Sequence, residues 1–297
     1  MSTAATSGAA VRVDEIDAVD VHVHVEEGCH GETALPEEFA AAAAKYFRSD
    51  GVGRDLSAIA AHYRERRTAA VVFTVDARTQ LGRIGVPVAE LLDRAADHAD
   101  VLIPFASVDP RRGSTAVAEA RSFVREHGAR GFKLHPTLQG FDPSDPELCP
   151  LWAEISDLGV PVLIHSGQTG IGAGLPGGGG LKLRYSNPML VDDVAADFPD
   201  LKIILAHPSV PWQDEAISIA THKPNVFIDL SGWSPKYFPE QLVRAARSYL
   251  QDKVLFGSDF PLITPDRWMR DFEGLGIDGP VRSKILKDNA VRLLGLA

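Results

Sequence analysis

The sequence carries a His-x-His pair inside a run of β-branched residues. His22 and His24 alternate with Val21, Val23 and Val25. Side chains of a strand alternate between its two faces, so this spacing predicts that the imidazoles point one way and the valines the other. Two neutral imidazoles on one face provide half of a transition-metal site. The alternative is a pair of core histidines satisfied by hydrogen bonds.

Further polar side chains end apolar runs later in the chain. His165 closes Val-Leu-Ile-His, His207 closes Ile-Leu-Ala-His, and Asp259 lies in Phe-Gly-Ser-Asp-Phe-Pro. A polar side chain in such a place is costly unless it has a partner. Any one of them could be an isolated core residue, but the repetition at several strand ends indicates a shared site.

Lys133 and His135 share a strand face in Gly-Phe-Lys-Leu-His-Pro, and this face should be the inner one. A buried lysine without a partner is costly. Three interpretations stay open. Lys133 could be carbamylated and bridge two metal ions, it could pair with Asp259 or a substrate carboxylate, or it could belong to a structural ion pair.

These side chains can form one site only if the fold brings the ends of several strands together. Short β-branched runs alternate with helical stretches along the chain, which predicts βαβ units that close into a (β/α)8 TIM barrel. An open doubly wound sheet is the runner-up, but no Gly-x-Gly-x-x-Gly follows any of the runs. The predicted strands are Val19–Val25, Ala69–Asp76, Val101–Asp109, Gly131–Pro136, Pro161–Gly167, Lys202–Pro208, Val226–Gly232 and Val254–Pro261. The predicted helices include Val86–His98, Thr115–Gly128, Pro146–Leu158, Pro188–Phe198, Trp212–His222 and Pro239–Leu250.

A helical insertion is predicted after the first strand. The segment Glu26–Thr68 is long for a barrel loop and contains helices near Pro36–Arg48 and Asp55–Arg67. It should lie over the barrel mouth, either as a stabilising cap or as a lid that contacts substrate.

A glycine-rich loop follows the fifth predicted strand. The segment Gly167–Gly180 holds eight glycines and is followed by Lys182 and Arg184. It is either a mobile lid or a loop whose amides approach an anion beside the two basic side chains.

Length, net charge and cysteine count exclude some classes of function. The chain has 297 residues and a formal net charge of -10, which argues against a general nucleic-acid or membrane binder. Residues 1–14 are expected to form a disordered tail, and residues 15–297 a single barrel domain. Cys29 and Cys149 are the only cysteines, which favours a cytoplasmic protein without disulfides.

The order of these motifs resembles the amidohydrolase superfamily. The segments Gly-Phe-Lys-Leu-His-Pro, Ala-His-Pro and Phe-Gly-Ser-Asp-Phe-Pro, with the closing Asn-Ala-Val-Arg-Leu-Leu-Gly, are most similar to the amidohydrolase-related branch, which contains aminocarboxymuconate semialdehyde decarboxylase and aromatic acid decarboxylases. The resemblance implies a metal-dependent hydrolase with one divalent ion, Zn²⁺ first and Mn²⁺ or Fe²⁺ as alternatives. By position, His22, His24, His165 and Asp259 would hold this ion, while His207 and Asp259 would be catalytic. A catalytically inactive binding barrel is disfavoured because all four ligand-type residues are present.

Within that branch the segments GFKLHPTLQGFDPSDP and HSGQTGIGAGLPGG look closest to enzymes that hydrolyse 4-hydroxyphenyl-β-ketoacyl-CoA. This resemblance implies hydrolysis of a carbon–carbon bond in a small-molecule substrate, a CoA thioester, by a homodimer. The alternative reaction is decarboxylation of an aromatic or unsaturated acid at the same site. Asp229 and Ser231 close the seventh strand as supporting groups or as ordinary turn residues. The expected substrate-binding residues are Lys133, His135, Arg184, Trp212, Trp233 and Tyr237.

Overall fold

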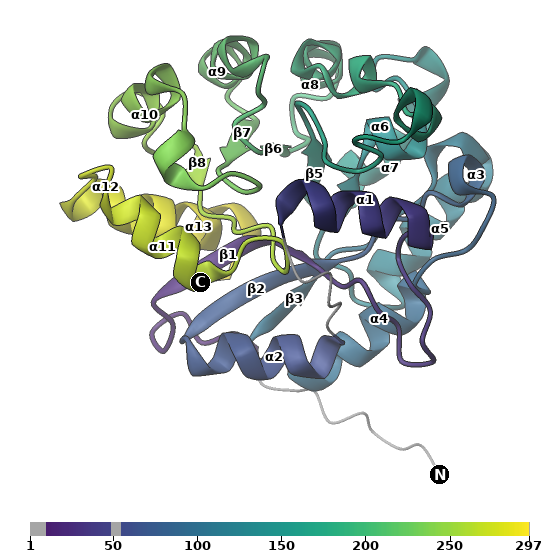
Figure 1. Cartoon of the computed structure of the whole chain (residues 1–297), viewed down its shortest axis with the longest axis horizontal. Helices are drawn as coiled ribbons and strands as arrows, with labels where there is room; N and C mark the ends of the chain where they lie inside the picture. Colours follow the sequence, from purple (N-terminus) through teal and green to yellow (C-terminus); the bar gives the residue numbers. More distant parts are fainter. Residues whose placement is uncertain (1–9, 49–54, 297) are drawn as a thin grey trace.

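Short parallel strands follow one another in chain order (Figure 1). The structure is a computed structural model that describes residues 10–48 and 55–296. The strands are β1 (Ala18–His24), β2 (Thr68–Phe73), β3 (Leu102–Pro104), β4 (Phe132–Leu134), β5 (Val162–His165), β6 (Ile203–Ala206), β7 (Val226–Asp229) and β8 (Val254–Leu255). Strands β1 to β3 form one hydrogen-bonded sheet and β4 to β8 a second. Isolated parallel bridges lie at both seams between the sheets, one from Ala106 to Phe132 and one from Val23 to Phe260.

Helices surround the strands, and this α/β arrangement confirms the predicted TIM-barrel fold. In Figure 1 helices lie around the strands, with α2 at the bottom, α4 and α5 on the right, α8 to α10 along the top and α11 to α13 on the left, while α1 lies toward the centre of the view. The helices are α1 (Glu37–Phe47), α2 (Leu56–Glu65), α3 (Arg78–Leu81), α4 (Val88–Ala95), α5 (Ser114–Arg125), α6 (Pro136–Gln139), α7 (Cys149–Asp157), α8 (Asp192–Asp197), α9 (Gln213–His222), α10 (Glu240–Arg247), α11 (Pro265–Glu273), α12 (Gly279–Ser283) and α13 (Asn289–Leu294).

The predicted elements are present, and most are shorter than predicted, while β1 keeps its predicted length and begins one residue earlier. The third predicted strand keeps regular pairing only at Leu102–Pro104, and the predicted helix Pro188–Phe198 begins with a 3-10 turn before α8. Helices α11 to α13 follow β8 and are not covered by any predicted segment. The last of these is tied to β8 by the buried Asn289, whose side-chain amide donates to the carbonyl of Val254 at 2.8 Å.

The side chains of β1 do not alternate strictly between the two faces of the strand. Its pairing with β2 shifts between Asp20 and Val23, so Val21 and His22 together oppose Val71. Such a bulge places two consecutive residues on one face. Val21 therefore packs in the same buried cluster as Val71, and the prediction that Val21 points away from the histidines is wrong.

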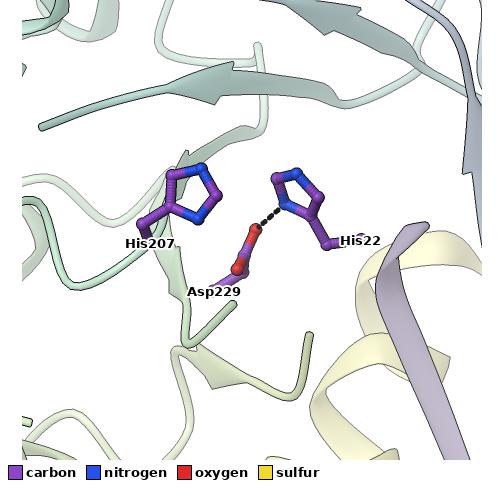
Figure 2. Close-up of side chains that lie close together, drawn as sticks. All are labelled: His22, His207 and Asp229. Carbon is purple, nitrogen blue, oxygen red and sulfur yellow. Dashed lines mark hydrogen bonds and ion pairs between the residues drawn. The ribbon is translucent and has the colours of Figure 1, made fainter. Parts of the chain in front are cut away.

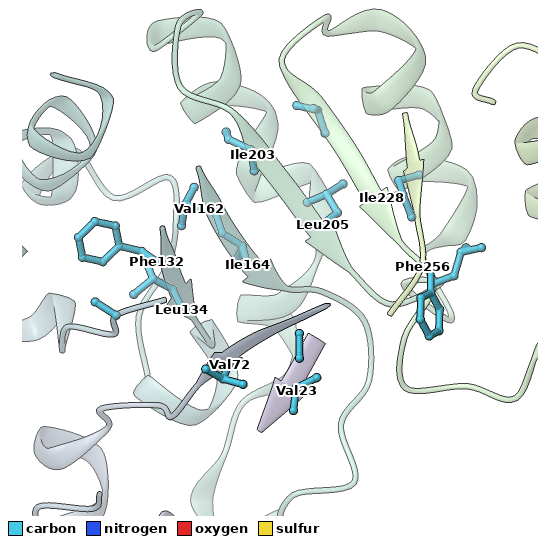
Figure 3. Packing of buried hydrophobic residues seen from close by; sticks show 14 of the residues in the cluster. Val23, Val72, Phe132, Leu134, Val162, Ile164, Ile203, Leu205, Ile228 and Phe256 are labelled. Atoms are coloured by element: carbon cyan, nitrogen blue, oxygen red, sulfur yellow. The ribbon is translucent and has the colours of Figure 1, made fainter. Parts of the chain in front are cut away.

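Alternate strand residues pack outward against the helices. Figure 3 shows this layer, in which Val72, Leu134, Ile164, Leu205 and Ile228 belong to one cluster. These side chains are buried, and each contributes ~1.5–3 kcal/mol by leaving water. This packing holds the strands in place, so that the side chains on their inner face meet at the strand ends.

The predicted insertion contains two helices. The carboxylate of Asp55 caps α2 by accepting from the Ala58 amide at 2.7 Å. Leu56, Ile59 and Tyr63 of this helix are buried at helical spacing, so α2 packs as an outer-layer helix. Helix α1 behaves differently, because several of its residues line the pocket described below.

The glycine-rich loop packs against α1. A Cβ atom on Gly179 would lie 2.6 Å from ring carbons of Phe39, and one on Gly170 would lie 2.5 Å from Phe47. Gly179 also has a φ of +65°, a conformation that glycine adopts without strain. The two glycines thus allow the loop and the insertion helix to approach closely.

Two predicted segments lie partly outside the described residues. These are residues 1–9 of the expected tail and residues 49–54 of the insertion. None of the helices in the described ranges has the length and apolar character that a membrane crossing needs.

Candidate metal centre

Three ligand-type side chains meet at the carboxyl ends of β1 and β8. The Nε2 atoms of His22 and His24 lie 3.2 Å apart. An Asp259 carboxylate oxygen lies 3.3 Å from the first of these nitrogens and 3.1 Å from the second. These three residues form one of the groups in the described chain that could hold a metal ion.

The spacing of these donors fits a small divalent ion. A tetrahedral centre with metal–ligand distances of about 2.0–2.1 Å has ligands about 3.3 Å apart, close to the three separations found here. His165 is the fourth residue that the sequence predicts as a ligand, and its Nε2 atom is buried without a hydrogen-bond partner among the described residues. His165 is not within the close three-residue group, and its Nδ1 atom lies 3.0 Å from Nε2 of His207.

A second layer of polar groups orients His22. Figure 2 shows His22 Nδ1 facing the buried Asp229 carboxylate, and the two atoms are 2.8 Å apart. When Nε2 of a histidine faces a metal, Nδ1 carries the proton and donates it to such a carboxylate. The hydroxyl of Ser231 lies 2.9 Å from the same nitrogen and 2.8 Å from Nδ1 of His207. Ser231 therefore joins His22 and His207 through one hydroxyl group.

His207 and Asp259 both have left-handed backbone conformations, with φ angles of +73° and +71°. Non-glycine residues adopt this region at some cost, and such strain is concentrated at functional sites. His207 is buried beside the cluster of His22, His24 and Asp259, with its ring centroid 4.8 Å from that of His22.

Lys133 and His135 lie beside the same centre. The Lys133 Nζ atom is 3.0 Å from Nε2 of His22 and 4.8 Å from the centroid of the Phe73 ring. Lys133 has no ion pair within the described residues, but the charges of Asp229 and Asp259 act on it. The His135 ring stacks on His165 with centroids 3.7 Å apart.

Burial and charge set the protonation of these groups. Burial and then the Lys133 charge hold the pKa of His22 well below its usual value, so its ring is neutral. Burial also lowers the pKa of Lys133 to about 8. Burial opposes ionisation of Asp259, but the hydrogen bond from His24, and the charge that the nearby histidines carry when they are protonated, outweigh it and lower the pKa of this carboxyl. Neutral imidazoles and an ionised carboxylate are the forms that bind a metal.

A pocket of about 460 Å³ opens above these residues. Its lining includes His24, Lys133, His207 and Asp259. A volume in this range holds a small organic substrate. The further lining residues include Glu26, Tyr46, Phe47, Arg48, Gln168, Trp233, Tyr237 and Arg267.

The pocket contains some of the residues predicted to bind substrate and not others. Trp233 and Tyr237 line it, as do Lys133 and His135, whereas Arg184 and Trp212 do not. Arg184 instead lies over the ring of Tyr185, with its guanidinium carbon 4.9 Å from the centroid.

Sequence reasoning did not single out the residues that α1 and α11 bring to the pocket. Tyr46, Phe47 and Arg48 come from the end of α1, and Arg267 comes from α11. No local pattern marks them, because their role depends on where each helix crosses the barrel mouth.

Comparison with solved structures finds the same fold in enzymes and in an uncharacterised protein. A TIM-barrel protein from Bordetella bronchiseptica is 23% identical, with a TM-score of 0.74, and the match covers 94% of this chain and 98% of that chain. A dihydroxybenzoic acid decarboxylase from Polaromonas, solved with manganese and an inhibitor, is 17% identical, with a TM-score of 0.67 and coverage of 95% and 97%. A probable 2-pyrone-4,6-dicarboxylic acid hydrolase from Acinetobacter baumannii is 17% identical, with a TM-score of 0.61 and coverage of 94% and 100%.

No curated protein sequence matches the chain significantly. The family model for amidohydrolases matches residues 19–296, which include every strand from β2 to β8 and nearly all of β1. The matched range also contains the two histidines of β1 and the carboxylate that follows β8. The chain therefore belongs to the amidohydrolase family.

Proposed function

We propose that this protein is a metal-dependent hydrolase that cleaves a carbon–carbon bond next to a carbonyl group of an aromatic substrate. The observation that carries the proposal is the cluster of His22, His24 and Asp259, because His24 and Asp259 line the pocket. His165 lines the same pocket, and its buried Nε2 atom has no hydrogen-bond partner among the described residues. These donor types suit a divalent ion such as Zn²⁺, with Mn²⁺ or Fe²⁺ as alternatives.

When bound, the ion would lower the pKa of a coordinated water toward ~7 and so supply a nucleophile at neutral pH. The carboxylate of Asp259 would accept the proton that the attacking water loses. His207, which lies beside His22 and Ser231, would transfer this proton to the carbon that leaves. Water would add to the carbonyl carbon, the adjacent carbon–carbon bond would break, and its electron pair would take up that proton.

The pocket lining supports an anionic, aromatic substrate. Lys133 provides a cationic group in the lining, and Arg48 and Arg267 provide two more. Neither of these arginine side chains has an ion-pair or hydrogen-bond partner within the described residues, which is notable in a chain with a net charge of -10. Trp233 and Tyr237 offer aromatic surface for packing a ring.

A CoA thioester with a 4-hydroxyphenyl-β-ketoacyl group fits this description. A pocket of about 460 Å³ accommodates the aromatic acyl part, whereas the nucleotide would extend past the mouth. The test is to incubate the metal-loaded protein with this thioester in isotopically labelled water. We expect an aromatic carboxylic acid that carries the label and a shortened acyl-CoA. Failure to turn over this thioester, together with turnover of a shorter aromatic β-ketone, would reject the CoA ester and keep the reaction.

Decarboxylation of a hydroxybenzoic acid is the second candidate. It is favoured by the likeness to the Polaromonas decarboxylase and by the Lys133 ammonium in the pocket lining, which suits a substrate carboxylate. In this reaction a proton is delivered to the ring carbon before carbon dioxide leaves. Release of carbon dioxide from 2,6-dihydroxybenzoate, with no labelled acid formed from the thioester, would place this candidate first.

A further inference from the structure

A second group of ligand-type side chains lies outside the barrel centre. The Cys29 sulfur, a ring nitrogen of His30 and a carboxylate oxygen of Glu90 all lie within 4.8 Å of one another. Cys29 and His30 are in the first turn of the insertion after β1, and Glu90 is on α4. The Cys29 thiol donates a hydrogen bond to the Glu90 carboxylate.

The turn that carries the first two residues is well defined. An antiparallel bridge joins Glu27 to Thr33, and the Gly28 amide donates to the Glu32 carbonyl at 2.8 Å. The Glu32 carboxylate folds back onto this turn and accepts from the His30 amide at 3.1 Å. A second carboxylate is thereby held beside the group.

The partner helix is also held firmly. Val88, Leu91, Leu92 and Ala95 of α4 are buried, so the helix packs on the barrel and presents Glu90 from a fixed backbone. The site therefore joins a local turn to a residue about sixty positions further along the chain.

The group offers negative charge to a cation. The Glu90 carboxylate contacts the Cys29 thiol, and the Glu32 carboxylate contacts the His30 amide. A metal ion would bind the thiolate form of Cys29. Cys149 is equally exposed but has no such neighbours in any ligand-type group of the described residues.

We propose that Cys29, His30 and Glu90 bind a second divalent transition-metal ion, separate from the barrel centre. Thiolate and imidazole ligands select Zn²⁺ and related ions over Mg²⁺ or Ca²⁺, which prefer oxygen. Binding releases the thiol proton to solvent. Glu32 or water completes the coordination.

The site has a structural consequence for the pocket. Ala34 and Leu35 follow the turn directly and line the pocket, and the segment then enters α1. A Cβ on Gly85 would lie 3.1 Å from the Ala34 carbonyl oxygen, so this segment already packs closely against the residues before α4. An ion at Cys29 would fix the base of the insertion to α4.

Co²⁺ titration of the full-length Cys149→Ser protein tests the proposal, because a thiolate ligand gives cobalt a near-ultraviolet charge-transfer band that histidine and carboxylate ligands do not give. We expect a saturable band that Cys29→Ser abolishes and that Glu90→Gln or His30→Ala weakens roughly tenfold or more in affinity. Glu37→Gln, an exposed carboxylate on α1, is the matched control and should leave the band unchanged. Elemental analysis of Zn²⁺-loaded protein should show one ion fewer in Cys29→Ser.

Three outcomes would overturn the proposal. One is the absence of the band in both Cys149→Ser and Cys149→Ala proteins that retain native circular dichroism. The second is a cobalt affinity that Glu90→Gln and His30→Ala both leave unchanged from the Cys149→Ser parent, which would mean that the thiol binds cobalt without the other two groups. The third is an unchanged zinc content in Cys29→Ser.

Discussion

At the scale of single residues, two histidines close to each other have different surroundings. The His22 ring lies between the Asp229 carboxylate and the Asp259 carboxylate, and it is fully buried. His207 has a strained backbone, lines the pocket and touches the cluster through Ser231 and His165. The first arrangement suits a fixed ligand, and the second suits a residue that exchanges protons with substrate.

Replacement of His207 by asparagine should keep the metal and remove most activity. General acid–base groups contribute typically ~10²–10⁴-fold, so kcat/KM should fall by about that factor. Metal content by elemental analysis and steady-state kinetics are the two measurements. His222→Asn, at an exposed position on α9, is the control. If His207→Asn lost its metal instead, His207 would be a ligand, and a two-metal centre with carbamylated Lys133 would become the better description.

At the scale of elements, α2 contacts the strands that carry the metal cluster. The buried Tyr63 hydroxyl of α2 donates to Asp20 at 2.7 Å. Asp20 also accepts from the amides of Ser258 at 2.9 Å and His22 at 3.1 Å. One carboxylate therefore links α2, β1 and the loop after β8, at the seam where the two sheets share only an isolated bridge.

Tyr63→Phe should destabilise the protein, because it leaves the buried Asp20 without one hydrogen bond while changing volume little. The expected loss is ~1–3 kcal/mol in the free energy of unfolding, measured by urea denaturation. Tyr249→Phe removes a hydroxyl from a side chain that is 57% exposed and should change stability little. Equal losses in the two variants would show that the link to Asp20 contributes nothing specific.

The contact between the glycine-rich loop and α1 gives a second prediction for the elements. Gly179→Ala would place a methyl group against the Phe39 ring, and overpacking of this kind costs ~1–3 kcal/mol. Because α1 also lines the pocket, we expect KM to rise several-fold. Gly174→Ala is the matched control, since Gly174 has a φ of +82° but nothing within 4 Å of its added Cβ. A Gly174→Ala variant with the same rise in KM would assign the effect to backbone strain alone.

At the scale of the whole molecule, the metal centre brings together residues from the first strand, the fifth strand and the loop after the last strand. Its proposed ligands come from β1, β5 and the loop after β8, and the ligands of different elements are at least 94 residues apart in the chain. An ion that binds only when these strands are assembled stabilises the folded state by mass action.

Chelation should therefore lower the melting temperature. A ligand at a hundred times its Kd contributes about 2.7 kcal/mol, and this contribution is lost when the metal is removed. Calorimetry with and without chelator is the measurement, in a Cys29→Ser background so that only the barrel centre is present. His24→Ala should melt at the same temperature in both conditions. A chelator effect that persists in His24→Ala would place the stabilising ion elsewhere.

The sequence by itself determined the fold class and the positions of the polar strand ends. Strand and helix periods are local properties, so alternating β-branched and helical segments predicted the barrel, and His22, His24 and Asp259 were identifiable because each follows or interrupts an apolar run. The same local signal also located the two helices of the insertion and the polar residues at the end of the seventh strand, where β7 ends at Asp229 and Ser231 follows it.

Only the tertiary structure decided how these residues meet. The bulge that turns Val21 inward depends on pairing between β1 and β2, which no single segment encodes. The shared hydrogen bonds of Ser231 with His22 and His207, and the entry of Arg48 and Arg267 into the pocket, require elements that are distant in the chain to pack at particular angles. Such contacts are set by the joint packing of the whole barrel, because the free energy that selects them comes from burial shared among many elements.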